Sequence, residues 1–90
     1  MIKPFYAVLA DPERDARCKA LLDEGYKHMR ELLRIHSQEA MWGLINAANA
    51  MQELGYDMIW YKSRRILAAR RKDGTTLEEK HLDHTDSSLH

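Results

Sequence analysis

Basic side chains crowd one short stretch of this chain. Residues 62 to 72 contain six of its fourteen lysines and arginines, and two aromatic residues stand directly before them. An arginine guanidinium presents forked donors that fit a carboxylate or a phosphate, and Arg, Trp and Tyr dominate the binding energy of protein interfaces. We therefore predict a partner-binding segment that consists of Trp60, Tyr61, Lys62, Arg64, Arg65, Arg70, Arg71 and Lys72.

The partner of this segment could be a protein or a nucleic acid. A third interpretation is that the segment has no partner and is a solvated face neutralised by the acidic residues that follow it. The formal net charge of the chain is zero, and residues 75–90 carry more acidic than basic side chains, which would repel phosphate close to the segment. A protein partner is therefore our first prediction. The alternative is a nucleic-acid-binding regulator that uses residues 62–72.

Histidine and carboxylate side chains recur at helical spacing, which is the pattern of metal-binding helices. The candidate sets are Glu24, His28 and Glu31, then His36 and Glu39, then His81 and His84 with His90 farther along the chain. A metal site also needs ligands from other elements, and exposed side-chain pairs three or four residues apart are common on helices. The sequence therefore predicts neither a metal nor a cofactor. Because nucleophile–base sets and phosphate-binding glycine loops are also missing from the sequence, we predict that the protein is not an enzyme.

Arg30 and His36 are separated by five residues on a stretch with helical periodicity. This spacing resembles the short motif of the helical HEPN-type ribonucleases, in which such residues from two subunits meet. The resemblance covers that motif alone. It implies a helical dimer that cleaves RNA with Arg30 and His36, and we keep this as a third hypothesis for the function.

Two long amphipathic helices are predicted over residues 12–35 and 38–54, and they would form an antiparallel pair. Apolar residues recur at helical spacing in both stretches. Ser37 is a good N-cap for the second helix, and Gly55 can end it. The pattern predicts Leu22, Met29, Leu32 and Leu44 in the core. Cys18, the single cysteine, lies on the same apolar face and is predicted to be buried rather than reactive.

Residues 56–72 fit two structures. A third helix over residues 57–72 would place its apolar residues on one stripe and end in a basic turn, and Ala and Arg favour it through 68–72. The alternative has strands at 58–61 and 66–69, joined by a turn at 62–65, with Asp73 and Gly74 as a second hairpin turn. We predict a mainly α fold with the third helix and an extended N-terminal arm at residues 2–9. The alternative is an α+β fold in which residues 2–9 and 57–80 form a small antiparallel sheet.

Ninety residues predict one domain over 1–90, with a flexible acidic tail at 75–90. Two helices with several apolar sides expose more apolar surface than a single small core can cover. We therefore predict a homodimer. Its interface would use Trp42, Gly43, Ala47 and Ala50. The sequence contains no apolar run long enough to span a membrane, and we expect the protein to act in the cytoplasm. The predicted function is that of a small regulator, adaptor or inhibitor, of a kind that phages and mobile elements also encode.

Overall fold

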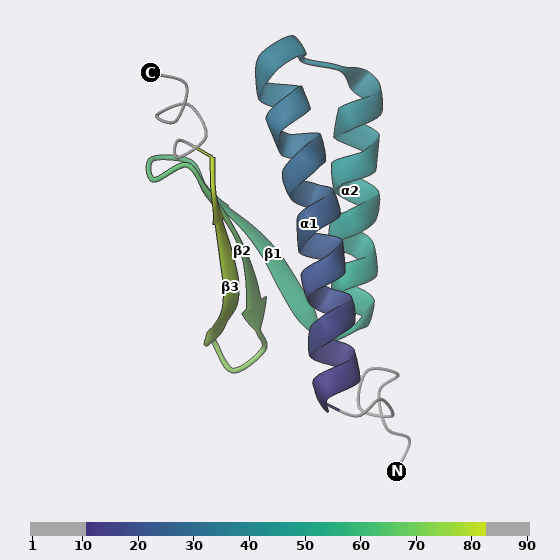
Figure 1. Cartoon of the computed structure of the whole chain (residues 1–90), viewed down its shortest axis with the longest axis vertical. Helices are drawn as coiled ribbons and strands as arrows, with labels where there is room; N and C mark the ends of the chain where they lie inside the picture. Colours follow the sequence, from purple (N-terminus) through teal and green to yellow (C-terminus); the bar gives the residue numbers. More distant parts are fainter. Residues whose placement is uncertain (1–10, 83–90) are drawn as a thin grey trace.

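A helical hairpin followed by a three-stranded antiparallel sheet makes up the fold (Figure 1). The structure is a computed structural model, and it describes residues 11–82. The elements are α1 (Asp11–Ile35), α2 (Gln38–Glu53), β1 (Tyr56–Tyr61), β2 (Ile66–Arg71) and β3 (Thr76–His81). The strands lie in the order β1-β2-β3, with β2 in the centre. In Figure 1, α2 lies on the far side of α1 from β2 and β3.

The two predicted helices are confirmed, and their ends follow the predicted caps. The Ser37 hydroxyl accepts a hydrogen bond from the Ala40 backbone N–H at 3.2 Å, which satisfies one of the free donors of the first turn of α2. Gly55 follows the end of the helix with a φ of 92°, a left-handed conformation that glycine adopts without a steric cost. The chain therefore leaves α2 sharply and enters β1 one residue later.

The predicted third helix over residues 57–72 is wrong, and with it the mainly α fold. This region forms strands instead, so the fold is α+β. The strands run through the part of the chain that the alternative assigned to a sheet, and β3 also occupies part of the predicted tail. The predicted arm at residues 2–9 lies outside the described residues, as do residues 83–90 of the tail.

Packing overrides the helix propensity of Ala68, Ala69 and Arg70 in β2. Four consecutive residues, Ile66 to Ala69, are buried. A strand alternates its side chains between two faces, so burial of four in a row requires cover on both. Leu67 and Ala69 belong to the core cluster, whereas Ile66 and Ala68 are buried outside it, on the other face. A helix with the same sequence would turn these four side chains in four directions and would lose part of this burial.

The turn between β2 and β3 is encoded locally. Gly74 has a φ of 94°, and the Asp73 carboxylate accepts hydrogen bonds from the backbone N–H and the hydroxyl of Thr75, at 2.9 and 2.7 Å. An Asp that accepts from the residue two positions ahead is a common turn-forming arrangement. These hydrogen bonds also hold the pKa of Asp73 below its ordinary value.

The core lies between the helical hairpin and the inner face of the sheet. The cluster consists of Cys18, Leu22, Met29, Met51, Leu54, Tyr56, Leu67, Ala69 and Leu82. Leu22 and Met29 are buried as predicted, whereas Leu32 and Leu44 are half-buried at the edge of the cluster. The Tyr56 hydroxyl donates a hydrogen bond to the Asp15 carboxylate, so the buried phenol also attaches β1 to the start of α1.

Burial of Cys18 predicts a loss of stability at high pH. The side chain is fully buried, and this burial, reinforced by the carboxylates of Asp15 and Glu78, raises the thiol pKa to about 12 from 9.0. Between these two values only the unfolded chain releases the proton, so the stabilisation is complete below pH 9 and is lost as the pH rises towards 12. At pH 10 the loss should be about 1.4 kcal/mol.

Urea unfolding of the wild type and of Cys18→Ala at pH 7.5 and pH 10 measures this loss. The stability advantage of the wild type over the variant should shrink by about 1.4 kcal/mol at the higher pH. Because every other titrating group is common to the two proteins, an advantage that is equal at both pH values would contradict the prediction.

Candidate partner-binding groove

The predicted basic segment is divided between the two ends of the sheet. Lys62, Arg64 and Arg65 lie in the β1–β2 turn, whereas Arg70, Arg71 and Lys72 lie at the opposite end of β2. Since a strand rises about 3.3 Å per residue, the two groups are roughly 20 Å apart. The segment therefore does not form one continuous patch.

The group at the β2–β3 end is paired with acidic side chains. Arg71 lies 3.7 Å from the Asp15 carboxylate, and the Lys72 amine lies 3.2 Å from that of Asp57. Arg70 is the direct cross-strand neighbour of Asp57. Ion pairs as exposed as these contribute little to stability, but they leave little net positive charge at this end of the sheet for a partner.

The group at the β1–β2 turn is joined by cations from α1. Lys27, Arg30 and Arg34 are exposed and share one side of the helix, over roughly 10 Å of its length. Arg30 and Arg34 line a hollow of about 260 Å³ together with Arg65 from the turn. We call this hollow, with the adjoining one described next, the basic groove.

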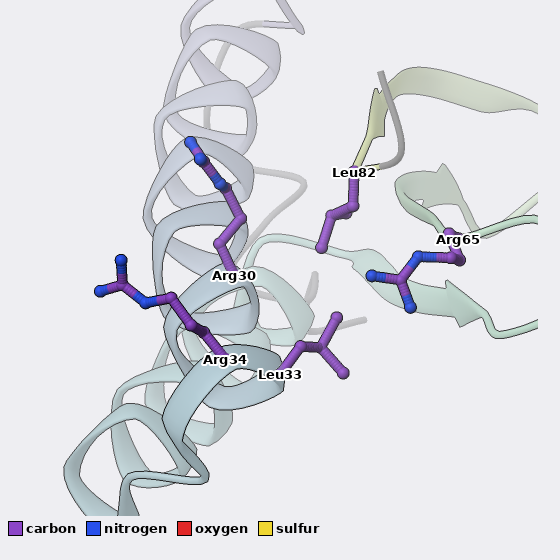
Figure 2. Close-up of a pocket in the computed structure, with 5 residues that line it drawn as sticks. All are labelled: Arg30, Leu33, Arg34, Arg65 and Leu82. Atoms are coloured by element: carbon purple, nitrogen blue, oxygen red, sulfur yellow. The ribbon is translucent and has the colours of Figure 1, made fainter. Parts of the chain in front are cut away.

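Leucine side chains form the apolar part of the basic groove. Figure 2 shows Leu33 of α1 and Leu82, which follows β3, pointing into the gap between the helix and the sheet, with the guanidinium of Arg65 beside them. The side chains of Arg30 and Arg34 leave α1 in another direction, towards an adjoining hollow of about 300 Å³ that Lys27 and Glu31 also line. Leu33 is 37% exposed, so an apolar surface is accessible next to the arginines.

Arg65 occupies an unusual backbone conformation. Its φ is 52°, in the left-handed region that glycine or asparagine would favour. The Arg65 carbonyl accepts a hydrogen bond from the Leu82 backbone N–H at 3.0 Å, which holds the turn against the end of β3. Non-glycine residues in this region cost about 1 kcal/mol or more and occur often at functional sites. An arginine at this position places its charge in the groove. It does so at a cost in backbone conformational energy that a glycine would avoid.

The two predicted aromatic residues lie on opposite faces of β1. Trp60 packs against the core cluster, and Tyr61 lies under the Arg64 guanidinium, whose carbon is 5.6 Å from the ring centre. Arg30 stacks in the same way on Tyr26, at 5.7 Å. These contacts restrain two of the arginines near the groove. Both tryptophan and tyrosine are half-buried, so a partner would meet only part of either ring.

The predicted oligomer residues divide between the interior and the surface. A Cβ on Gly43 would lie 2.5 Å from Nε2 of His28, so Gly43 faces α1. Ala47 is 4% exposed, and Ala50 is half-buried beside a hollow lined by Arg17, Leu21, Glu53 and Leu54. Trp42 is 54% exposed. Most residues of the predicted interface therefore pack within the helical hairpin of the same chain, and Trp42 is the one that remains on the surface. The homodimer itself stays a prediction.

Arg30 and His36, the residues of the ribonuclease hypothesis, do not share a helix. α1 ends at Ile35, and His36 lies in the connection to α2 with a φ of 53°. In the first of the histidine and carboxylate sets, the imidazole of His28 packs against Gly43 of α2. Within residues 11–82, no three His, Cys, Asp or Glu side chains are grouped closely enough to hold a metal ion.

Lys27 and Arg34 are site residues that sequence reasoning missed, and Arg30 was considered only for a different function, RNA cleavage. Their spacing of three and four residues was a visible signal, but on the polar face of a helix it is also the ordinary pattern of a solvated surface. Nothing in the sequence pairs this face with a turn thirty residues later. In the described part of the chain, neither helix has the length and apolar character needed to cross a membrane. Comparisons with protein-family models, with curated proteins and with solved structures found no match to this chain.

Proposed function

We propose that this chain is a small, non-enzymatic interaction protein of the cytoplasm, a regulator, adaptor or inhibitor, that binds an acidic surface of a partner protein in the basic groove. The observation that carries the proposal is that Arg30 and Arg34 of α1 border the same leucine-lined hollow as Arg65 of the β1–β2 turn, and extend from it towards the adjoining hollow. Arginine beside accessible apolar surface is typical of protein interfaces.

The chemistry of the groove suggests what the partner presents. The guanidinium groups of Arg30 and Arg34 can each form two parallel hydrogen bonds to a carboxylate. The accessible part of Leu33 can accept an aliphatic or aromatic side chain. A hollow of about 260 Å³ has room for a few side chains. The best match is a segment in which one apolar residue stands between acidic ones.

The surroundings of the titratable groups favour a binding role over catalysis. The described residues include no buried charged side chain, whereas acid–base catalysts usually owe their shifted pKa values to burial and charged neighbours. The pKa of the Cys18 thiol is raised, which is the opposite of what a nucleophilic cysteine needs.

A nucleic-acid-binding regulator is the second candidate, because the structure brings α1 cations next to the turn that was part of the predicted segment. Arg30 and Arg34 border a hollow with Arg65, which belongs to the turn that also carries Lys62 and Arg64. Phosphates would use these charges but not the apolar side of the hollow. We therefore place this candidate second.

Two charge-matched double variants test the proposal. Arg30→Gln/Arg34→Gln removes two charges from the groove, and Arg70→Gln/Lys72→Gln removes two from the other end of the sheet. The wild type and both variants are used as baits in the native host, and the affinity for the protein recovered is measured with purified components. We expect the groove variant to bind at least tenfold more weakly, because charge-assisted hydrogen bonds are worth about 1.5–3 kcal/mol each. The control variant should bind within about twofold of the wild type.

Gel shifts with mixed DNA and RNA at low salt separate the two candidates. The protein-partner proposal expects weak binding with a shallow dependence on salt. Tight binding to duplex DNA with a log–log salt slope of about −0.9 per phosphate, lost in the groove variant, would replace it with the second candidate. Equal partner binding by the wild type and both double variants would refute the basic groove as the binding site.

A further inference from the structure

The outward face of α2 carries no charged side chain between Glu39 and Glu53. Glu39 and Glu53 are the two charged residues of this 16-residue helix, and they stand near its ends. In the sequence as a whole, 31% of the residues are charged. Solvent-facing helix surfaces are normally rich in charged side chains, so the absence of charge from the central turns of α2 requires an explanation.

Large apolar side chains occupy this face. Met41 and Ile45 are each 39% exposed, and Trp42 is 54% exposed. These side chains are not part of the core, because α2 packs on the core with the opposite side, through Ala40, Ala47 and Met51. In Figure 1, α1 lies between α2 and strands β2 and β3, so the outer side of α2 faces away from them. The described part of the chain leaves this apolar surface uncovered.

The outward residues have the spacing of a two-stranded coiled-coil seam. Positions separated alternately by three and four residues hold Gln38, Met41, Ile45, Ala48 and Gln52. Alternating steps of three and four are what an α-helix needs to keep one stripe against a second helix. Trp42 and Asn49, seven residues apart, stand beside this stripe. The pattern fits a helix as the occupant of this face.

We propose that a second copy of this chain covers the face, with the two α2 helices antiparallel around a two-fold axis. A two-fold interface sets the same surface against itself, so any net charge on it would repel its copy. The central turns of α2, which carry no charged side chain, meet this condition. Ile45 would pack on Ala48 of the second copy, and Met41 on Gln52 of the second copy, so that large side chains meet smaller or polar ones. In a parallel pair, Ala48 would instead face Ala48 of the second copy. Glu39 and Glu53 would each lie near the same glutamate of the second copy.

The size of the contact predicts the strength of the association. α2 is about 24 Å long, and one helix face on its copy lies at the low end of specific interfaces, below roughly 1,200 Å² in total. We expect a dimer with a dissociation constant in the micromolar range. The proposal is independent of the basic groove, whose lining residues come from α1, the β1–β2 turn and Leu82.

Sedimentation equilibrium from 5 to 500 µM tests the interface with a matched pair of variants. Ile45→Glu places a carboxylate of each copy at the centre of the contact, and Asn46→Glu adds the same charge one residue away, outside the seam. Both positions are exposed, so both variants should fold, which circular dichroism verifies. We expect Ile45→Glu to raise the dissociation constant at least tenfold and Asn46→Glu to change it by less than twofold. A wild type that is monomeric at 500 µM overturns the proposal, as does an equal response to the two variants.

Disulfide formation tests the antiparallel arrangement. Mixing Met41→Cys with Gln52→Cys under mild oxidation should give a cross-linked heterodimer. Met41→Cys alone should not cross-link, because its two copies would lie roughly 16 Å apart along the axis. The native Cys18 is fully buried and should not take part. Efficient cross-linking of Met41→Cys with itself would overturn the antiparallel pairing.

Discussion

Leu67→Ala should lower the free energy of unfolding by about 3–5 kcal/mol. Leu67 is 1% exposed, sits on the central strand and belongs to the core cluster. A terminal methyl of its side chain lies 3.5 Å from the position that a Cβ on Gly25 would occupy, so the side chain reaches the surface of α1. Its removal would leave a cavity between the layers that neighbouring strands and helices can fill only in part.

Urea unfolding measures this loss, and Leu33→Ala is the control. Leu33 is 37% exposed, so the control should cost less than about 1 kcal/mol. Domains of this size are stable by roughly 5–15 kcal/mol, so the Leu67 variant should lose much of its stability. Similar midpoints for the two variants would show that β2 does not form the inner layer of the core.

Gly43→Val should destabilise the protein by about 2–3 kcal/mol, near the upper end of the usual cost of overpacking. The imidazole of His28 occupies the space beside Gly43, where a Cβ would lie 2.5 Å from Nε2 and 2.6 Å from Nδ1. A branched side chain cannot fit unless the ring moves or the two helices separate. Separation of the helices would weaken the close packing of α1 on α2.

The double variant His28→Ala/Gly43→Val shows whether this contact is the cause. With the ring removed, a branched side chain at position 43 should fit, so the double variant should recover most of the stability lost in Gly43→Val. Gly25→Ala is a second control, because its Cβ would meet the flexible end of Met58 rather than a ring. Equal destabilisation of Gly43→Val with and without His28 would contradict this account.

Local signals in the sequence were sufficient for the helical hairpin. The periodicity of the apolar residues, Ser37 as N-cap and Gly55 after the last turn act within a few residues of one another, so they can be recognised in a linear chain. The turn at Asp73 and Gly74 is local in the same sense. The burial of Cys18, Leu22 and Met29 followed from the same periodicity.

The third helix failed as a prediction because residues 57–72 satisfy two periodicities. Ala68 and Ala69 favour helix in isolation, but Leu67 and Ala69 must face the hairpin while Ile66 and Ala68 face the opposite way. Cross-strand neighbours and the helical layer decide between the two structures, and both are contributed by residues far away in the sequence.

The sequence alone determined that this chain forms a helical hairpin and carries clustered cations, because these features depend on residue type and local spacing. Only the tertiary structure decided which cations meet. Strand geometry separates Arg70 and Arg71 from Arg64 and Arg65 by most of the length of β2. Packing of the sheet on α1 places Arg65 at the same hollow that Arg30 and Arg34 border from the helix. Electrostatic and contact interactions act through space, so the groove depends on how the layers pack, which the order of residues along the chain does not show.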